Sequence, residues 1–70
     1  MAIPARLSWA VDTLDVRPAD RILEIGCGRG VAVDLICSRG GTATALNRSA
    51  TAIRAAEDRN ASHIASGQAM

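Results

Sequence analysis

A glycine-rich segment that directly follows a short apolar run constrains this chain most. Residues 21–25 read Arg-Ile-Leu-Glu-Ile, and glycines follow at Gly26, Gly28 and Gly30. Glycine adopts backbone angles closed to other residues and lets the main chain approach a ligand without a Cβ in the way. An apolar run that stops at glycine is typical of a buried strand in a parallel sheet. We therefore expect a buried strand at about 21–25 that turns sharply into a helix.

Helical and strand patterns continue on both sides of this segment. Pro4 suits the first turn of a helix, Gly40 the left-handed end of another, and Ser49 the N-cap of a further one. The expected elements are, in chain order, a helix at about 4–15, a strand at about 21–25, a helix at about 30–39, a strand at about 42–46 and a helix at about 50–60. Strand, helix and strand make one βαβ unit, which predicts an α/β fold in a single partial domain covering residues 1–70.

Residue spacing also predicts which side chains are buried and which are exposed. The first helix is expected to bury one apolar stripe, namely Leu7, Ala10, Val11 and Leu14. Arg59 is expected to face water on the last helix, and His63 to be a surface residue near its frayed end. Segment 62–70 shows no strong periodicity.

Composition argues against nucleic-acid and membrane partners. Trp9 is the only aromatic residue, so the chain lacks the rings on which nucleic-acid-binding modules stack bases. The net charge is +1, and the eight basic residues are arginines scattered along the chain without a run. No apolar stretch approaches the ~20 residues that span a bilayer, and the N-terminal segment lacks the continuous apolar stretch of a signal peptide.

The two cysteines, Cys27 and Cys37, are too few and too far apart for a zinc ribbon or a disulfide scaffold. We interpret them as reduced thiols and expect the protein in the cytoplasm. Cys27 stands inside the glycine segment at the start of a helix, a place that can lower the pKa of a thiol. No base or resolving partner accompanies it in the sequence.

The spacing of the glycines discriminates between ligands. A dinucleotide-binding fingerprint reads Gly-x-Gly-x-x-Gly and would place its third glycine at position 31, where this chain has Val31. The pattern here is instead Glu24-x-Gly-x-Gly-x-Gly. A carboxylate inside a buried apolar run costs several kcal/mol unless it is hydrogen-bonded or paired. Glu24 therefore indicates nearby amides or a ligand.

This segment resembles the first motif of the class I S-adenosylmethionine-dependent methyltransferases, an acidic residue at the end of strand one followed by Gly-x-Gly-x-Gly. In that family the turn packs against the methionine part of the cofactor, and the acidic residue supports the turn or the cofactor's amino group. The resemblance covers roughly Leu7 to Ser66 and implies a partial Rossmann-like methyltransferase fold that binds S-adenosyl-L-methionine. The implied cofactor-binding residues of this segment are Glu24, Gly26, Cys27, Gly28 and Gly30.

Asn47 departs from the family pattern. The family usually has Asp or Glu at the end of strand two, where one carboxylate accepts hydrogen bonds from both ribose hydroxyls, and by resemblance Asn47 holds that cofactor-binding position. An amide has one acceptor oxygen and two donors, so it pairs with one hydroxyl and makes no charge-assisted bond. The change is expected to weaken cofactor binding by ~1 to 3 kcal/mol.

The chain ends where the family would begin its third strand, so we expect a truncated piece without the elements that recognise the methyl acceptor. The implied function is the cofactor-binding portion of a methyltransferase acting on an unknown acceptor. No residue is assigned as catalytic, and the 70-residue chain by itself is not expected to be catalytically competent. One alternative is a degenerate remnant that binds nothing or self-associates through exposed sheet edges. A fragment of an NAD-type Rossmann domain is disfavoured by Val31.

Overall fold

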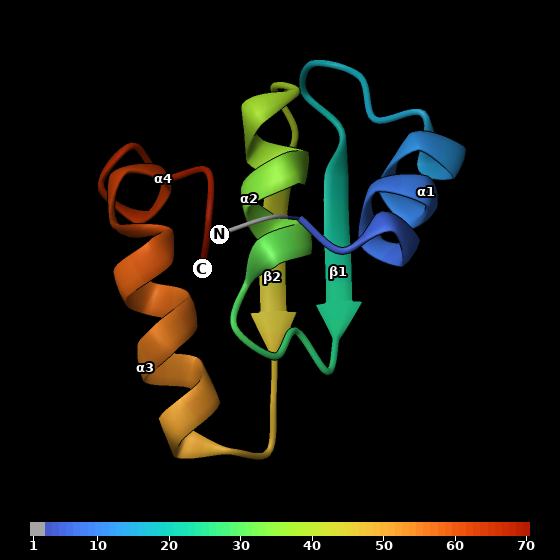
Figure 1. The fold of residues 1–70 in the computed structure, drawn as a ribbon. Helices are drawn as coiled ribbons and strands as arrows, with labels where there is room; N and C mark the ends of the chain where they lie inside the picture. Colours follow the sequence, from blue (N-terminus) through green and yellow to red (C-terminus); the bar gives the residue numbers. More distant parts are fainter. Residues whose placement is uncertain (1–2) are drawn as a thin grey trace.

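The computed structural model describes residues 3–70, and residues 1 and 2 of the expected domain lie outside this range. Its helices and strands, shown in Figure 1, are α1 (Ala5–Leu14), β1 (Arg21–Ile25), α2 (Val31–Ser38), β2 (Thr42–Leu46), α3 (Ala50–Arg59) and α4 (Ala61–Ala65). Both strands coincide with the expected ranges, and α1, α2 and α3 begin and end within one residue of theirs. None of these helices combines the length and the apolar character that crossing a bilayer requires.

The two strands lie side by side and run parallel. Arg21 is opposite Thr42 at one end of the pair, and Ile25 is opposite Leu46 at the other. The chain passes from β1 to β2 through α2, since parallel strands cannot be joined by a tight turn. The predicted α/β fold with one βαβ unit is therefore confirmed.

Local sequence signals account for the ends of the helices. Pro4 directly precedes α1, and its missing amide hydrogen removes no helical hydrogen bond there. Gly40 follows α2 with φ of 89°, a left-handed conformation that suits glycine. Ser49 precedes α3, and its Oγ accepts a hydrogen bond from the amide of Ala52 at 3.2 Å. The predicted cap at Ser49 is thus present.

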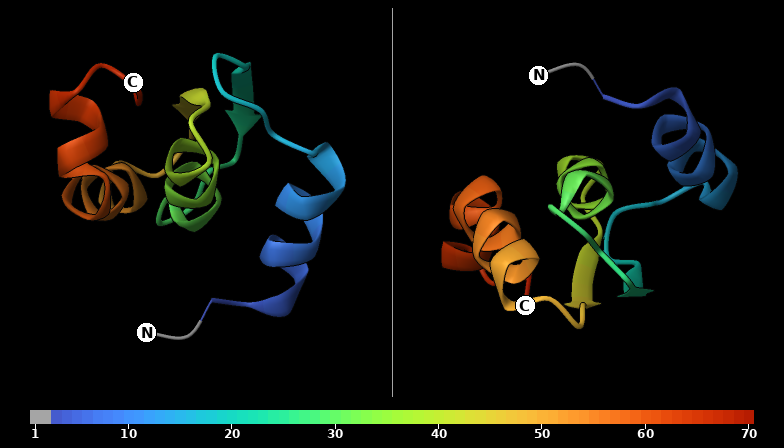
Figure 2. Two further views of the ribbon diagram at one scale, coloured as in Figure 1. Left: turned by 90° about the horizontal axis from the view of Figure 1, so that it is seen from above. Right: turned by 60° about the horizontal axis from the view of Figure 1, so that its bottom comes forward.

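One face of the sheet is covered by helices and the other is open. Figure 2 shows α1, α2 and α3 on the same side of the two strands. On the opposite face the large apolar side chains are exposed, with Leu23 at 60%, Ile25 at 79% and Leu46 at 53%. Burial therefore alternates along β1, because successive side chains of a strand point to opposite faces. The prediction of a buried strand at 21–25 was wrong, since residues 3–70 cover only one of its faces.

The core lies between α2, the covered face of the sheet and the flanking helices. Its buried apolar residues include Val11, Val33, Ile36, Cys37, Ala43 and Ala56. The predicted stripe of α1 is buried only at Val11, whereas Leu14 is 56% exposed. The helix packs chiefly against α2, and Val11 is the residue of α1 that belongs to the buried core. The expectation that Leu14 is buried was therefore wrong.

The C-terminal segment pairs with the outer edge of β2. The amide of Ala43 donates to the carbonyl oxygen of Gln68 at 2.7 Å, and the amide of Met70 donates to that of Ala43 at 3.0 Å. Ala69 forms a parallel bridge with Ala43. Together with α4, this pairing gives the segment after Asn60 a regular structure that its weak periodicity does not reveal. The partners are distant in the chain, so no local periodicity could reveal them.

Candidate functional site

The glycine turn, defined here as residues 26–30, joins the end of β1 to the start of α2. The amides of Gly26 and Cys27 both donate to the carbonyl oxygen of Leu46, at 2.8 and 3.0 Å, which ties the turn to the end of β2. The amide of Gly30 donates to the carbonyl oxygen of Cys27 at 3.0 Å and closes the turn. The turn therefore lies at the carboxyl ends of both strands, where open α/β sheets bind their ligands.

All three glycines of the turn have left-handed backbone angles. Their φ values are 76° at Gly26, 55° at Gly28 and 81° at Gly30. A Cβ added at Gly26 or Gly28 would meet no atom within 4 Å, so both face open space. A Cβ at Gly30 would instead lie 2.5 Å from Nδ2 of Asn60 and 2.9 Å from the Cβ of Ala56. The first two glycines expose bare backbone, and the third permits close packing against α3.

Asn47 directly follows β2 and lines a hollow beside the glycine turn. The hollow has a volume of about 320 Å³ and is also lined by Ile25, Gly26, Leu46 and Arg48. Oδ1 of Asn47 accepts a hydrogen bond from the amide of Arg48 at 3.0 Å. In Figure 1 both strand arrowheads point to this end of the molecule. The structure thus brings Gly26 and Asn47, two of the predicted site residues, to one hollow.

Glu24 lies in β1 opposite Ala45 and does not line this hollow. Its Oε1 is buried and accepts no hydrogen bond from residues 3–70. Burial raises the pKa of the Glu24 carboxyl above its ordinary value, because desolvation disfavours the charged form. The expected neighbouring amide is therefore not supplied by these residues, and one buried acceptor is left unpaired.

Cys27 is buried inside the turn, and its Sγ lies 3.7 Å from the carbonyl oxygen of Gly28. Burial raises the pKa of this thiol, and the carboxylate of Glu24 raises it further. The suggestion that the helix start lowers the pKa of Cys27 was therefore wrong, because desolvation dominates. Cys27 lines a second, largely apolar cavity of about 490 Å³, which α3, α4 and the C-terminal segment enclose together with β2.

Two solved structures share this fold. A SAM-dependent methyltransferase from Thiobacillus denitrificans, in complex with S-adenosyl-L-homocysteine, superposes with a TM-score of 0.79 at 22% identity, covering 96% of this chain and 27% of that one. A SAM-dependent methyltransferase from Geobacter sulfurreducens, also in complex with S-adenosyl-L-homocysteine, superposes with a TM-score of 0.80 at 20% identity, covering 97% and 28%. The chain has part of the SAM-dependent methyltransferase fold.

A sequence relative agrees with this methyltransferase fold. The chain is 32% identical over 54 residues to a protein of Paracidovorax citrulli named ubiquinone biosynthesis O-methyltransferase. The matched region covers 77% of this chain and 22% of that protein. No protein-family model matches the sequence. The chain therefore spans about a quarter of the length of the methyltransferases that it matches.

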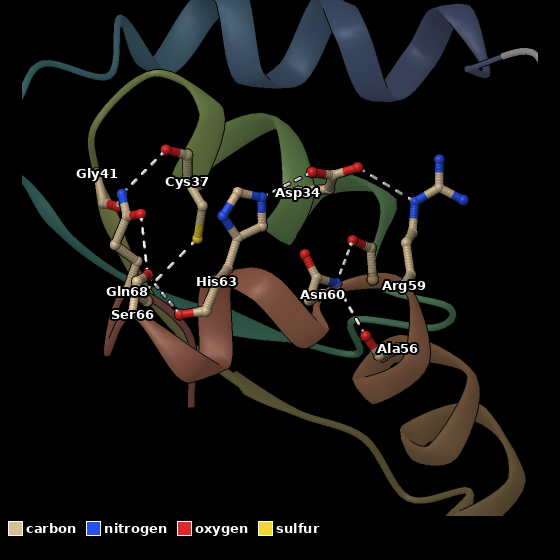
Figure 3. Close-up of polar contacts among 10 residues, drawn as sticks. Asp34, Cys37, Gly41, Ala56, Arg59, Asn60, His63, Ser66 and Gln68 are labelled. Atoms are coloured by element: carbon tan, nitrogen blue, oxygen red, sulfur yellow. Dashed lines mark hydrogen bonds and ion pairs between the residues drawn. The ribbon is translucent and has the colours of Figure 1, made fainter.

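Sequence reasoning missed Asn60, which joins the methyltransferase fold's glycine turn to α3. Asn60 is 2% exposed and lies between α3 and α4. Its Nδ2 donates to the carbonyl oxygens of Gly30 and Ala56, both at 3.0 Å. Figure 3 shows the side chain of Asn60 and its hydrogen bond to Ala56. An asparagine that ends a helical pattern reads as an ordinary cap, so only its partner 30 positions earlier reveals this role.

Sequence reasoning also misplaced two charged side chains. Nε2 of His63 lies 2.9 Å from Oδ1 of Asp34, and Nε of Arg59 lies 3.5 Å from Oδ2 of the same carboxylate (Figure 3). The expectations that Arg59 faces water and that His63 is a surface residue were wrong, because both pack toward Asp34 on α2. Within residues 3–70, no group of His, Cys, Asp and Glu side chains is arranged to hold a metal ion.

Proposed function

We propose that this chain is the S-adenosylmethionine-binding portion of a methyltransferase. The observation that carries the proposal is the bare backbone at Gly26 and Gly28, where left-handed angles coincide with open space at the carboxyl ends of two parallel strands. The fold shared with two methyltransferases in complex with S-adenosyl-L-homocysteine supports the same reading. Methyl transfer to an acceptor is likewise a proposal, because the matched region makes up only about a quarter of those methyltransferases.

The residues present fit the cofactor in two places. The glycine turn lets the main chain approach the amino-acid part of the ligand, and Asn47 at the adjoining hollow would hydrogen-bond one ribose hydroxyl. The buried, unpaired Oε1 of Glu24 lies in the strand that leads into the turn. Its carboxylate is an acceptor for an ammonium group or an amide that the described residues do not supply.

The bound cofactor supplies a positively charged sulfur that makes its methyl group electrophilic. The chain's own contribution is to bind and orient: the turn holds the amino-acid end, and Asn47 holds the ribose. No side chain of residues 3–70 is assigned to proton transfer, and the buried thiol of Cys27 stays protonated because its pKa is raised. We therefore propose that the methyl acceptor is recognised by parts of a methyltransferase other than the region that this chain matches.

Calorimetric titration of the chain with S-adenosyl-L-homocysteine tests the proposal. The most informative variant is Gly28→Ala, because its new Cβ would project into the open space proposed for the ligand. Gly67→Ala is the matched control, since Gly67 also has positive φ and open surroundings but lies after α4. We expect saturable binding by the parent chain and by Gly67→Ala, and a loss of affinity of roughly tenfold or more in Gly28→Ala.

The absence of saturable heat at millimolar ligand would contradict the proposal and favour a degenerate remnant. Full competition by NAD would instead favour a dinucleotide-binding fragment, even though Val31 occupies the position of the third glycine in the dinucleotide fingerprint. An equal loss of affinity in the two glycine variants would show that the effect comes from backbone strain and not from the proposed site.

Two further expectations belong to the proposal. The thiols of Cys27 and Cys37 are free and buried, which supports a reducing compartment such as the cytoplasm. Within residues 3–70 no strand pairs with the outer edge of β1, so self-association along this edge remains a proposal. Sedimentation velocity over a range of concentrations tests it, and a concentration-independent monomer would exclude it.

A further inference from the structure

We propose that Asn60 is a positioning residue that fixes the glycine turn for the cofactor. This inference rests on the proposed function and adds a residue that lies outside the glycine motif. Asn60 is one of the most deeply buried side chains of the protein. Its amide group reaches from the end of α3 to the carbonyl oxygen of Gly30, the residue that caps α2.

The contact is close because Gly30 has no side chain. A Cβ at Gly30 would lie 2.5 Å from Nδ2 of Asn60, so the hydrogen bond of 3.0 Å needs a glycine at this position. The other end of Gly30 is fixed by its own amide, which donates to Cys27 within the turn. Asn60 lies outside the turn and holds its last residue, Gly30, through this hydrogen bond. Helix α2, which follows Gly30 directly, does not supply this contact to α3.

Helix α3 connects this contact to the second half of the site. The helix begins after Ser49, two positions beyond Asn47, and Asn60 directly follows its last residue. Asn47 lines the hollow at the end of β2, whereas Asn60 holds the turn at the end of β1. A ten-residue helix is a rigid spacer of about 15 Å. Asn60 thus sets the glycine turn relative to the residue proposed to bind the ribose.

The donors of Asn60, and not its oxygen, make this connection. Nδ2 donates twice, to Gly30 and to Ala56, while Oδ1 is buried and accepts no hydrogen bond from residues 3–70. An unpaired buried acceptor is unfavourable, and an apolar side chain of similar shape would avoid it. The amide group therefore holds the turn through its two donors, while its unpaired oxygen lowers local stability.

Replacing the amide should loosen the turn without unfolding the chain. The carbonyl oxygen of Gly30 also accepts a hydrogen bond from the backbone amide of Asp34. The carbonyl oxygen of Ala56 likewise accepts one from the backbone amide of Asn60. Both carbonyls therefore keep a backbone partner in Asn60→Leu. The variant removes two side-chain donors, keeps the branched shape of the side chain and eliminates the unpaired oxygen.

Gln68→Leu is the matched control. Nε2 of Gln68 also donates to two carbonyl oxygens, of Cys37 at 3.1 Å and of Gly41 at 3.4 Å, but it holds the C-terminal segment and not the turn. Far-UV circular dichroism establishes that each variant is folded. Asn60→Ala, which removes the same two donors without adding a charge or bulk, replaces Asn60→Leu if that variant does not fold.

The two readouts are the affinity for S-adenosyl-L-homocysteine by calorimetry and hydrogen exchange of the backbone amides of residues 26–30 in the ligand-free chain. In Asn60→Leu we expect a loss of affinity of roughly tenfold and exchange in the turn faster by a similar factor. In Gln68→Leu we expect both quantities at the turn to stay within about twofold of the parent, with faster exchange only at residues 68–70.

Unchanged affinity and unchanged turn exchange in Asn60→Leu would overturn the inference, and so would an equal effect of Gln68→Leu at the turn. Failure of the parent chain to bind the ligand would refute the proposed function instead. In that event the exchange measured without ligand still decides whether Asn60 orders the turn.

Discussion

Nε2 of His63 lies 2.9 Å from Oδ1 of Asp34 and so connects α4 to α2 across 29 positions of sequence. Nε of Arg59 lies 3.5 Å from the other oxygen of the same carboxylate. One carboxylate near the start of α2 thereby contacts the last turn of α3 and the middle of α4. The side chain of His63 is 18% exposed, so water screens this cluster less than an ion pair on the open surface.

We expect Asp34→Asn to lower the free energy of unfolding by about 1 kcal/mol, because it removes the charge from a partly buried hydrogen bond and an ion pair. Asp15→Asn breaks a largely exposed pair with Arg17 and should change stability by less than about 0.5 kcal/mol. Urea denaturation followed by circular dichroism measures both values. Equal effects of the two variants would mean that the cluster has no special contribution.

Gly30→Ala should destabilise the fold more than Gly67→Ala. Both positions have positive φ, and left-handed geometry costs an alanine ~1 kcal/mol. At Gly30 the new Cβ would also collide with Asn60 and Ala56, which adds about 1 to 3 kcal/mol for overpacking, whereas at Gly67 it meets nothing within 4 Å. Urea denaturation of both variants tests this, and equal losses would contradict the close approach of α3 to the turn.

Glu24 should make stability depend on pH. Its folded-state pKa is raised above the ordinary value of 4.5, so the folded chain binds the proton more tightly than the unfolded chain. The free energy of unfolding therefore decreases as the pH rises from below 4.5 through the raised pKa. In Glu24→Gln this decrease is absent, so the variant should be more stable than the parent at neutral pH, with a difference that shrinks below pH 4.5.

The measurement is urea denaturation of parent and variant across the acidic range. Glu57→Gln serves as the control, since Glu57 is exposed on α3 and its replacement reports only general effects of removing a carboxylate. A Glu24→Gln variant that loses stability at neutral pH would show that the carboxylate is stabilised in the fold, contrary to its burial without a partner.

Asn47→Asp should increase the affinity for S-adenosyl-L-homocysteine. A carboxylate at the end of β2 can accept hydrogen bonds from both ribose hydroxyls, whereas the amide has one acceptor oxygen, which here also accepts from the amide of Arg48. We expect a gain of roughly tenfold, measured by calorimetry. Asn47→Ala should reduce affinity, and a gain in that control as well would place the ribose away from Asn47.

Local sequence features were sufficient to predict much of the fold and the position of the glycine turn. The glycines at 26, 28 and 30 lie in the turn where they were expected, and Gly26 meets Asn47 at one hollow. Glu24 was singled out correctly as an anomaly, but its burial without a partner could not be read from its neighbours in sequence. Asn60 was missed because its partner is Gly30, far from it in the chain.

Interactions between residues a few positions apart specify the elements from α1 to α3, the helix caps and the left-handed end of α2 at Gly40, so these features can be predicted from the sequence alone. Contacts between distant segments place Asn60 against the turn, His63 and Arg59 beside Asp34, and residues 68–70 along β2. The tertiary structure also leaves one face of the sheet open. These outcomes depend on which elements pack together, and packing between distant segments leaves no periodic trace in a single sequence.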